Sequence, residues 1–365
     1  MNAKNTGEIN LEQAILNAEL PGLGRSFAAL GARIDLAAVA DQFDIDIVMP
    51  VACAGLWDAI EARVRSCAEA EGVELHDVRL RTEIPAYGVQ RNLKRLPGIG
   101  NLIAVSSGKG GVGKSTVAVN LALAWQAEGA RVGILDADVY GPSLPRMLGL
   151  PAEPPNSIDG KQFVPVAAHG LQAMSIGLLL DDSAPAVWRG PMATSALNQL
   201  LRQTAWRELD ILIIDMPPGT GDIQLTLAQT VPVAGAIVVT TPQDVALSDA
   251  RKGLEMFRKV SVPLLGIVEN MSIYRCPSCG HTASLFGQGG GEKLAHETGL
   301  RLLGELPLDP VVGEGLDAGQ PTVAADPDSE LSHRFRQIAI SAGLALAEGR
   351  RDYSMAFPEI VVEDT

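Results

Sequence analysis

The chain has 365 residues, a length that suggests about two domains. Hydrophobic residues make up 47% of it and aromatic residues only 4%, so its apolar surface is mostly aliphatic, as the buried sheets of α/β proteins require. The net charge of −14 argues against non-specific nucleic-acid binding, which needs Lys and Arg to displace phosphate counterions. We therefore expect no nucleic-acid partner.

The N-terminal residues, MNAKNTGEINLEQ, are polar and lack the apolar core of a secretory signal. No apolar run reaches the roughly 18 residues that are needed to span a bilayer. The sequence thus predicts a cytoplasmic protein without a membrane partner, in which thiols stay reduced. The four cysteines are then expected to be free thiols or metal ligands.

Residues 1–90 predict a small α+β module with a ββαβ-like order. The segment 44–52, DIDIVMPVA, is typical of a strand. Residues 54–71 carry apolar side chains at helical spacing, and residues 73–84 return to strand periodicity.

The stretch 85–100 is rich in Pro, Gly and basic residues and is typical of a linker, which we assign to residues 91–100. From residue 101 to 350, short apolar runs alternate with helical segments. Runs of this kind form strands that are buried on both faces. The sequence therefore predicts an α/β domain with a mostly parallel sheet covered by helices on both faces. Residues 351–365 are expected to be a polar tail.

The segment 108–115, GKGGVGKS, lies between a predicted strand and a predicted helix, which is the context of a nucleotide-binding phosphate loop in a P-loop NTPase. Lys114 is expected to reach the β- and γ-phosphates of ATP, and the Ser115 hydroxyl to bind Mg²⁺. The other residues expected to hold the phosphates, mostly through backbone N–H groups, are Gly108, Lys109, Gly110, Gly111, Val112, Gly113 and Thr116.

Lys109 is an additional lysine in this loop, placed directly after its first glycine. We expect its side chain to face away from its own loop. It is either a solvated surface lysine or a group that crosses a dimer interface and stabilises charge at the partner's nucleotide, as an arginine finger does.

Three aspartates follow apolar strands near the expected carboxyl edge of the sheet. Asp215 is expected to hold Mg²⁺ through water. Asp136 and Asp138 share one side of their strand by alternation. We expect Asp136 to organise Mg²⁺ waters and Asp138 to position the attacking water, with helix capping as the alternative.

Two further positions complete the expected nucleotide site. The loop DMPPGTGD at 215–222 resembles a switch, and the N–H group of Gly219 is expected to sense the γ-phosphate. Asn270 follows another apolar strand and is expected to read the nucleobase.

Cys276 and Cys279 form a lone CxxC motif, with His281 as a possible third ligand. Two thiolates supply only half of a tetrahedral zinc site or of a [4Fe–4S] site. A second copy of the chain would supply the rest at a two-fold axis. An iron–sulfur cluster bridging two subunits, a bridging zinc and a redox dithiol all fit the motif. Cys53 and Cys67 are expected to be buried and inert.

Several motifs appear in order between residues 108 and 280: GKGGVGKST, DADVYGPS, RGPM, DMPPGTGDIQLTLAQ, TTPQDVAL, GIVENMS and CPSCG. Together they resemble the bacterial Mrp/ApbC-type iron–sulfur carriers, which belong to the deviant Walker A ATPases with MinD, the ParA partition proteins and the nitrogenase iron protein. The resemblance covers about residues 100–345.

The resemblance implies a homodimer that hydrolyses ATP at the subunit interface and passes a labile [4Fe–4S] cluster to apo iron–sulfur proteins. Lys109 matches the signature lysine of the family, Lys114 its Walker lysine, and Cys276 and Cys279 its cluster ligands. Two other functions remain open on the sequence. They are a MinD- or ParA-like spatial-organisation ATPase with a zinc or redox CxxC, and a metal-binding regulatory module whose ATP hydrolysis is vestigial.

Overall fold

The computed structural model describes residues 6–39, 41–90, 93–151, 153–158, 160–179 and 190–352. The chain divides into two compact units: residues 1–84 with 125–130, and residues 85–124 with 131–365. Parts of three sequence features fall outside the described residues: most of the expected polar tail, two residues of the expected linker, and the arginine of the RGPM motif.

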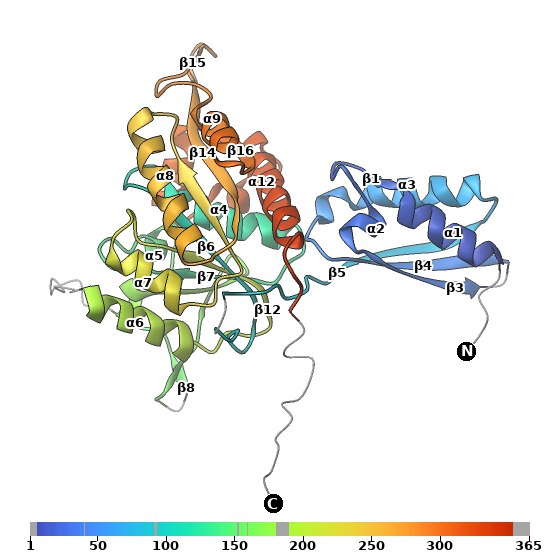
Figure 1. The fold of residues 1–365 in the computed structure, drawn as a ribbon, viewed down its shortest axis with the longest axis horizontal. Helices are drawn as coiled ribbons and strands as arrows, with labels where there is room; N and C mark the ends of the chain where they lie inside the picture. The colour runs from blue at the N-terminus through green and yellow to red at the C-terminus, as the bar shows by residue number, and fades with distance from the viewer. Residues whose placement is uncertain are drawn as a thin grey trace, which may run out of the picture. The chain divides into compact units, whose positions relative to one another are not determined.

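The first unit pairs a three-stranded sheet with helices (Figure 1). Its elements are α1 (Thr6–Asn17), β1 (Glu19–Leu20), β2 (Arg25–Ser26), α2 (Phe27–Leu30), β3 (Arg33–Val39), β4 (Gln42–Met49), the 3₁₀ helix η1 (Ala54–Leu56), α3 (Trp57–Ala70) and β5 (Leu75–Thr82). Strand β4 pairs antiparallel with β3 and parallel with β5. The order β3, β4, α3, β5 confirms the predicted ββαβ pattern.

Helix α3 shows why this unit folds as it does. Ile60, Val64, Cys67 and Ala68 lie on one side of the helix and are buried, whereas the residues between them are mostly exposed. This is the apolar stripe that the sequence spacing predicts. Cys53 and Cys67 are both buried free thiols, as expected.

The second unit is a nine-stranded sheet with helices (Figure 1). Its strands are β6 (Ile99–Ser107), β7 (Val132–Asp136), β10 (Val166–Ala168), β11 (Leu171–Ser175), β12 (Leu209–Asp215), β13 (Gly235–Thr240), β14 (Leu264–Arg275), β15 (Thr282–Ala283) and β16 (Leu302–Leu308). The strand order is β10-β11-β7-β12-β6-β13-β14-β15, with β16 also paired to β14. The pairs from β11 to β14 and the β14–β16 pair are parallel, and only β10 and β15 pair antiparallel.

The remaining elements of this unit are its helices and a small hairpin. They are α4 (Lys114–Ala127), α5 (Leu144–Met147), β8 (Ser157–Ile158), β9 (Gln162–Phe163), the 3₁₀ helix η2 (Ile176–Leu179), α6 (Gly190–Gln203), α7 (Asp222–Thr230), α8 (Asp244–Lys259), α9 (Gly290–Thr298), α10 (Pro310–Asp317), α11 (Thr322–Ala325) and α12 (Glu330–Ala347). None of the helices in the described ranges has the length and hydropathy to cross a bilayer.

The connections that leave the neighbouring strands β6 and β12 run in opposite directions, which creates the place for a site. The connection from β6 to β7 runs one way along the sheet, and the connection from β12 to β13 runs the other way. Right-handed crossovers then put α4 on one face and α7 and α8 on the other, as Figure 1 shows. Alternate residues of the central strands, including Leu102, Leu212 and Val238, pack with α7 and α8. Ligands bind at such switch points, beyond the carboxyl ends of the strands.

Part of the expected linker segment belongs to the second unit. Tyr87 is 2% exposed, and its N–H group donates to Oδ1 of Asn101. The Gln90 side chain donates to the carbonyl of Ala228 and accepts from the N–H group of Val233. The boundary therefore falls after residue 84 rather than after residue 90, because these polar groups are buried and find partners within the larger unit.

Candidate functional site

The phosphate loop joins β6 to α4, as the sequence predicts. Gly111 and Gly113 have φ angles of 81° and 79°, in the left-handed region that glycine adopts without strain. Gly108 is required for another reason, since a Cβ there would lie 2.2 Å from the carbonyl carbon of Asp249 in α8. The loop therefore ends at the N-terminus of α4, where an anion is stabilised by free N–H groups and by the helix dipole.

All the residues predicted to hold the phosphates lie in this loop or in the first turn of α4. They are Gly108, Lys109, Gly110, Gly111, Val112, Gly113, Lys114, Ser115 and Thr116.

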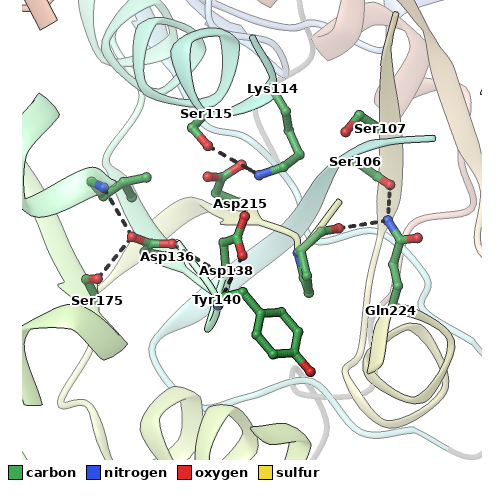
Figure 2. A network of polar contacts seen from close by, with 12 residues as sticks. Ser106, Ser107, Lys114, Ser115, Asp136, Asp138, Tyr140, Ser175, Asp215 and Gln224 are labelled. Atoms are coloured by element: carbon green, nitrogen blue, oxygen red, sulfur yellow. Dashed lines mark hydrogen bonds and ion pairs between the residues drawn. The ribbon is translucent and has the colours of Figure 1, made fainter. Parts of the chain in front are cut away.

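Lys114 and Asp215 form a buried ion pair at the centre of the site (Figure 2). Nζ of Lys114 lies 2.5 Å from Oδ1 of Asp215 and 3.3 Å from Oγ of Ser115. Burial raises the pKa of Asp215, and the Lys114 cation opposes that rise. Oδ2 of Asp215 is buried and finds no hydrogen-bond partner within the described ranges. An orphaned carboxylate oxygen beside a serine hydroxyl is a donor set that fits Mg²⁺ and its waters.

Asp136 lies beside Asp215 in the sheet register and is fully buried. Its Oδ1 accepts from the N–H group of Asp138 at 3.1 Å. Its Oδ2 accepts from the N–H group of Leu144 at 3.1 Å and from the hydroxyl of Ser175 at 3.0 Å. Burial and the charge of Asp215 raise the pKa of Asp136 to about 7. These hydrogen bonds hold the loop after β7 in place, so they favour the capping alternative for Asp136. The role of Asp136 toward Mg²⁺ stays a prediction.

Asp138 lies beyond the end of β7 and is half-buried. Its Oδ1 accepts from the N–H group of Tyr140 at 3.3 Å, which leaves its other oxygen for a solvent partner. Figure 2 shows its carboxylate near the pair of Lys114 and Asp215. The Tyr140 side chain is 65% exposed. The role of Asp138 toward an attacking water stays a prediction.

The predicted switch loop is tied to β6 in this structure. The N–H group of Gly219, which has a φ angle of 95°, donates to the carbonyl of Ser107 at 3.0 Å. The buried Gln224 of α7 donates through Nε2 to Oγ of Ser106 and to the carbonyl of Pro217 at 3.2 Å. Gly219 would have to release Ser107 before it could contact a phosphate. Gln224 was not predicted, although a glutamine in an apolar helix after a Gly- and Pro-rich loop is a usable signal.

Lys109 is half-buried rather than fully extended into solvent. Its Nζ lies 3.5 Å from Oε1 of Gln243, the residue before α8 in the same chain. That contact is long for a hydrogen bond. Reaching a partner's nucleotide would require the side chain to leave Gln243, so the role in trans stays a prediction.

Asn270 lies on β14 and is 7% exposed. Its Nδ2 donates to the carbonyl of Val112 in the phosphate loop at 2.9 Å. The side chain that we expect to read the nucleobase therefore supports the loop itself in this structure, and the contact with a base stays a prediction.

The two cysteines of the CxxC motif lie at the tip of the hairpin between β14 and β15. The Cys276 N–H group donates to the carbonyl of His281 at 2.8 Å, and the Gly280 N–H group donates to the carbonyl of Cys276 at 2.9 Å. Cys279 is exposed and Cys276 is half-buried. The N–H groups of Cys279 and Ser278 hydrogen-bond to the Cys276 sulfur and lower the pKa of that thiol. This geometry favours a thiolate, the form that binds metals.

No group of three or more His, Cys, Asp or Glu side chains within the described ranges is arranged to hold a metal ion. His281 is not arranged with Cys276 and Cys279 as a three-ligand group in the described residues, and its role as a third ligand stays a prediction. Its backbone carbonyl helps to close the hairpin by accepting the hydrogen bond from Cys276. The hairpin presents two thiols, which is half of a four-ligand site.

Comparison with known proteins gives consistent matches. Residues 98–342 match the family model of the ParA group described as the NUBPL iron-transfer P-loop NTPase. The chain is 48% identical to the iron-sulfur cluster carrier protein of Haemophilus influenzae, over 90% of this chain and 89% of that protein. It is 50% identical to the protein of the same description from Escherichia coli K12, over 89% of this chain and 88% of that protein. It is also 48% identical to the mouse iron-sulfur cluster transfer protein NUBPL, over 74% of this chain and 84% of that protein.

Solved structures agree with the fold. A nucleotide-binding protein from Archaeoglobus fulgidus in complex with ADP has a TM-score of 0.57 and 38% identity, covering 66% of this chain and 94% of that one. The cell division ATPase MinD of Pyrococcus furiosus has a TM-score of 0.51 at 23% identity, covering 66% and 98%, and shows the fold alone.

Proposed function

The chain belongs to the NUBPL family of iron-transfer P-loop NTPases and is an ATPase of that family, and we propose that it carries an iron–sulfur cluster and transfers it to apo iron–sulfur proteins. The observation that carries the proposal is the exposed cysteine hairpin on the same unit as the phosphate loop. The names of the relatives, iron-sulfur cluster carrier and transfer proteins, support it.

The cargo is a [4Fe–4S] cluster held between two copies of the chain. Each hairpin offers the thiols of Cys276 and Cys279. Such a cluster takes four thiolates, and two hairpins related by a two-fold axis supply that number. Exposure suits a cargo site, because a cluster that must be passed on has to be reached by the recipient.

ATP is the nucleotide that we assign to the phosphate loop. Lys114 exchanges its contact with Asp215 for the β- and γ-phosphates, and Ser115 and Asp215 would hold Mg²⁺. Bound Mg²⁺ supplies charge neutralisation at the transferred phosphoryl group. Asp138 orients the attacking water through its free oxygen. The ion pair with Lys114 holds the Asp215 carboxylate in place beside the phosphate loop.

Lys109 acts on the nucleotide of the partner subunit. Its distance from Gln243 is long enough that little is lost when the side chain turns outward. The same two-fold axis then completes the nucleotide site and the cluster site, since each of them needs a group from the second chain.

The cargo assignment is tested by anaerobic reconstitution with ferrous iron and sulfide. The variant with Cys276→Ala and Cys279→Ala is expected to bind no cluster, by iron and sulfide analysis and by the visible absorption of the protein. Cys67→Ala is the matched control, because that thiol is buried on α3 and is expected to leave cluster content unchanged. Unchanged cluster content in the double variant would show that the cargo assignment is wrong, and zinc in place of iron in freshly isolated protein would replace it with a zinc site.

A further inference from the structure

Strand β14 connects the phosphate loop to the cysteine hairpin. Asn270 donates from Nδ2 to the carbonyl of Val112. A Cβ placed on Gly113 would lie 2.2 Å from that Nδ2 and 3.6 Å from Cε of Met271. Two consecutive residues of one strand therefore reach the same point of the loop. In a regular strand their side chains would point to opposite faces of the sheet.

The backbone at Met271 explains how both side chains reach the loop. Met271 has a φ angle of 58°, in the left-handed region that a bulky side chain occupies only under strain. It lies in a bulge, because Asn270 pairs with Leu306 and Tyr274 pairs with Leu308, so that three residues of β14 oppose one of β16. Residues in such rare conformations gather at switch regions, where the surrounding structure holds them in place.

Hydrogen bonds hold both the bulge and the segment that follows it. Within it, the hydroxyl of Ser272 donates to the carbonyl of Leu306 in β16 at 3.1 Å. Directly after it, Tyr274 and Arg275 pair with β15, the second strand of the cysteine hairpin. Cys276 is the next residue along the chain. A short, hydrogen-bonded segment therefore connects the contact with Val112 and Gly113 to the thiols.

We propose that Met271 is a positioning residue that couples the phosphate loop to the cysteine hairpin. Its strained conformation holds Asn270 and its own thioether against Gly113, and it sets where β14 resumes its pairing before Cys276. Phosphate binding rearranges the loop backbone at Val112 and Gly113, and the bulge carries that change to the hairpin. The inference rests on the proposed function only in that nucleotide binds the phosphate loop; it requires no particular metal at the cysteines.

The test measures the reaction rate of the two exposed thiols with Ellman's reagent in metal-free protein, with and without a non-hydrolysable ATP analogue and Mg²⁺. Cys53 and Cys67 are buried, so the fast phase reports Cys276 and Cys279. Nucleotide is added at a saturating concentration determined separately for each variant by calorimetry. In the unaltered chain we expect nucleotide to change the rate about fivefold or more, the scale of ordinary coupling between two sites.

Met271→Gly removes both the strain and the side chain that lies beside Gly113, and it is expected to reduce the nucleotide effect to less than about twofold. Met271→Asn gives a second variant that tolerates the left-handed conformation, and it is expected to reduce the effect as well. Ser261→Gly is the matched control, because Ser261 has a φ angle of 57° in the exposed turn between α8 and β14. It relieves similar strain away from the phosphate loop and is expected to keep the full effect.

The inference is overturned by any of three outcomes. The first is that the Met271 variants keep the full nucleotide effect. The second is that Ser261→Gly loses the effect to the same extent as the Met271 variants, and the third is that the unaltered chain binds nucleotide without any change in thiol reactivity. Absence of nucleotide binding to the unaltered chain would instead contradict the ATPase assignment, so the two failures are told apart by the calorimetry.

Discussion

The phosphate site and the cysteine hairpin are built in opposite ways. Lys114, Asp136 and Asp215 are buried. Lys114 and Asp215 form an ion pair within one chain, and Asp136 accepts its hydrogen bonds from the same chain. Cys276 and Cys279 stand at a hairpin tip with no further metal ligand arranged around them among the described residues. The first arrangement suits chemistry that must exclude bulk water, and the second suits a cargo that must be transferred to another protein. Four predictions follow from this difference, in order of decreasing effect.

Lys114→Ala is expected to have the largest effect. It leaves the Asp215 carboxylate buried without its partner, which costs about 3–5 kcal/mol of stability. It also removes the cation from the phosphates, so ATP hydrolysis is expected to fall by about 100-fold or more. Urea unfolding and phosphate release measure the two losses. Adding Asp215→Asn should restore much of the stability without restoring activity, and a double variant as unstable as Lys114→Ala would contradict the ion-pair account.

Lys109→Ala is expected to slow hydrolysis at saturating ATP more than it weakens ATP binding, because the lysine acts on charge that develops in the transition state. Mixing it with Lys114→Ala tests the origin of the lysine. If Lys109 acts in trans, the mixed dimer contains one complete site, with Lys114 from one chain and Lys109 from the other. Activity should then reappear in the mixture. Two inactive proteins that stay inactive after subunit exchange would place Lys109 in its own site, beside Gln243.

The acid cluster predicts how stability depends on pH without nucleotide. Burial and the charge of Asp215 raise the pKa of Asp136 from its ordinary value of 3.8 to about 7. Between these values the unfolded chain loses the proton first, so the free energy of unfolding falls as pH rises from about 4 to about 7, by at most about 1.4 kcal/mol per pH unit. Urea unfolding at several pH values measures the slope. Asp136→Asn should flatten it, and an equal slope in that variant would assign it to other groups.

Replacing the cysteines of the hairpin is expected to have the smallest effect on folding. Cys276→Ser with Cys279→Ser should change the free energy of unfolding by less than about 0.5 kcal/mol, as at other surface positions. Cys53→Ser is the contrast, because that thiol is 0% exposed and burial raises its pKa to about 12. A serine hydroxyl there is expected to cost about 1–3 kcal/mol. Similar losses at both places would contradict the view of the hairpin as a separate surface feature.

The sequence predicts the phosphate loop well because its chemistry is local. The glycines at 111 and 113 adopt the conformations that only glycine adopts freely, and the loop stands between the expected strand and helix. Lys114 and Asp215 are 101 positions apart, yet both could be assigned, because parallel strands bring their carboxyl ends to one edge.

Features that depend on distant backbone contacts could not be predicted. Asn270 was expected at this edge, but its hydrogen bond to Val112 follows from how β14 approaches the loop. A left-handed methionine at 271 has no signature in the sequence, because the surrounding structure imposes it. The boundary of the first unit was missed for a similar reason: a segment rich in Pro and Gly packs through Tyr87 and Gln90 into the second unit.

The central claim is that one chain holds half of a cluster site. Native mass spectrometry of the anaerobically reconstituted protein tests it most directly. The account predicts one [4Fe–4S] mass increment on the dimer, none on the monomer, and none on the variant with Cys276→Ala and Cys279→Ala. A complete cluster on the monomer, or a dimer that carries the increment without these cysteines, would contradict it.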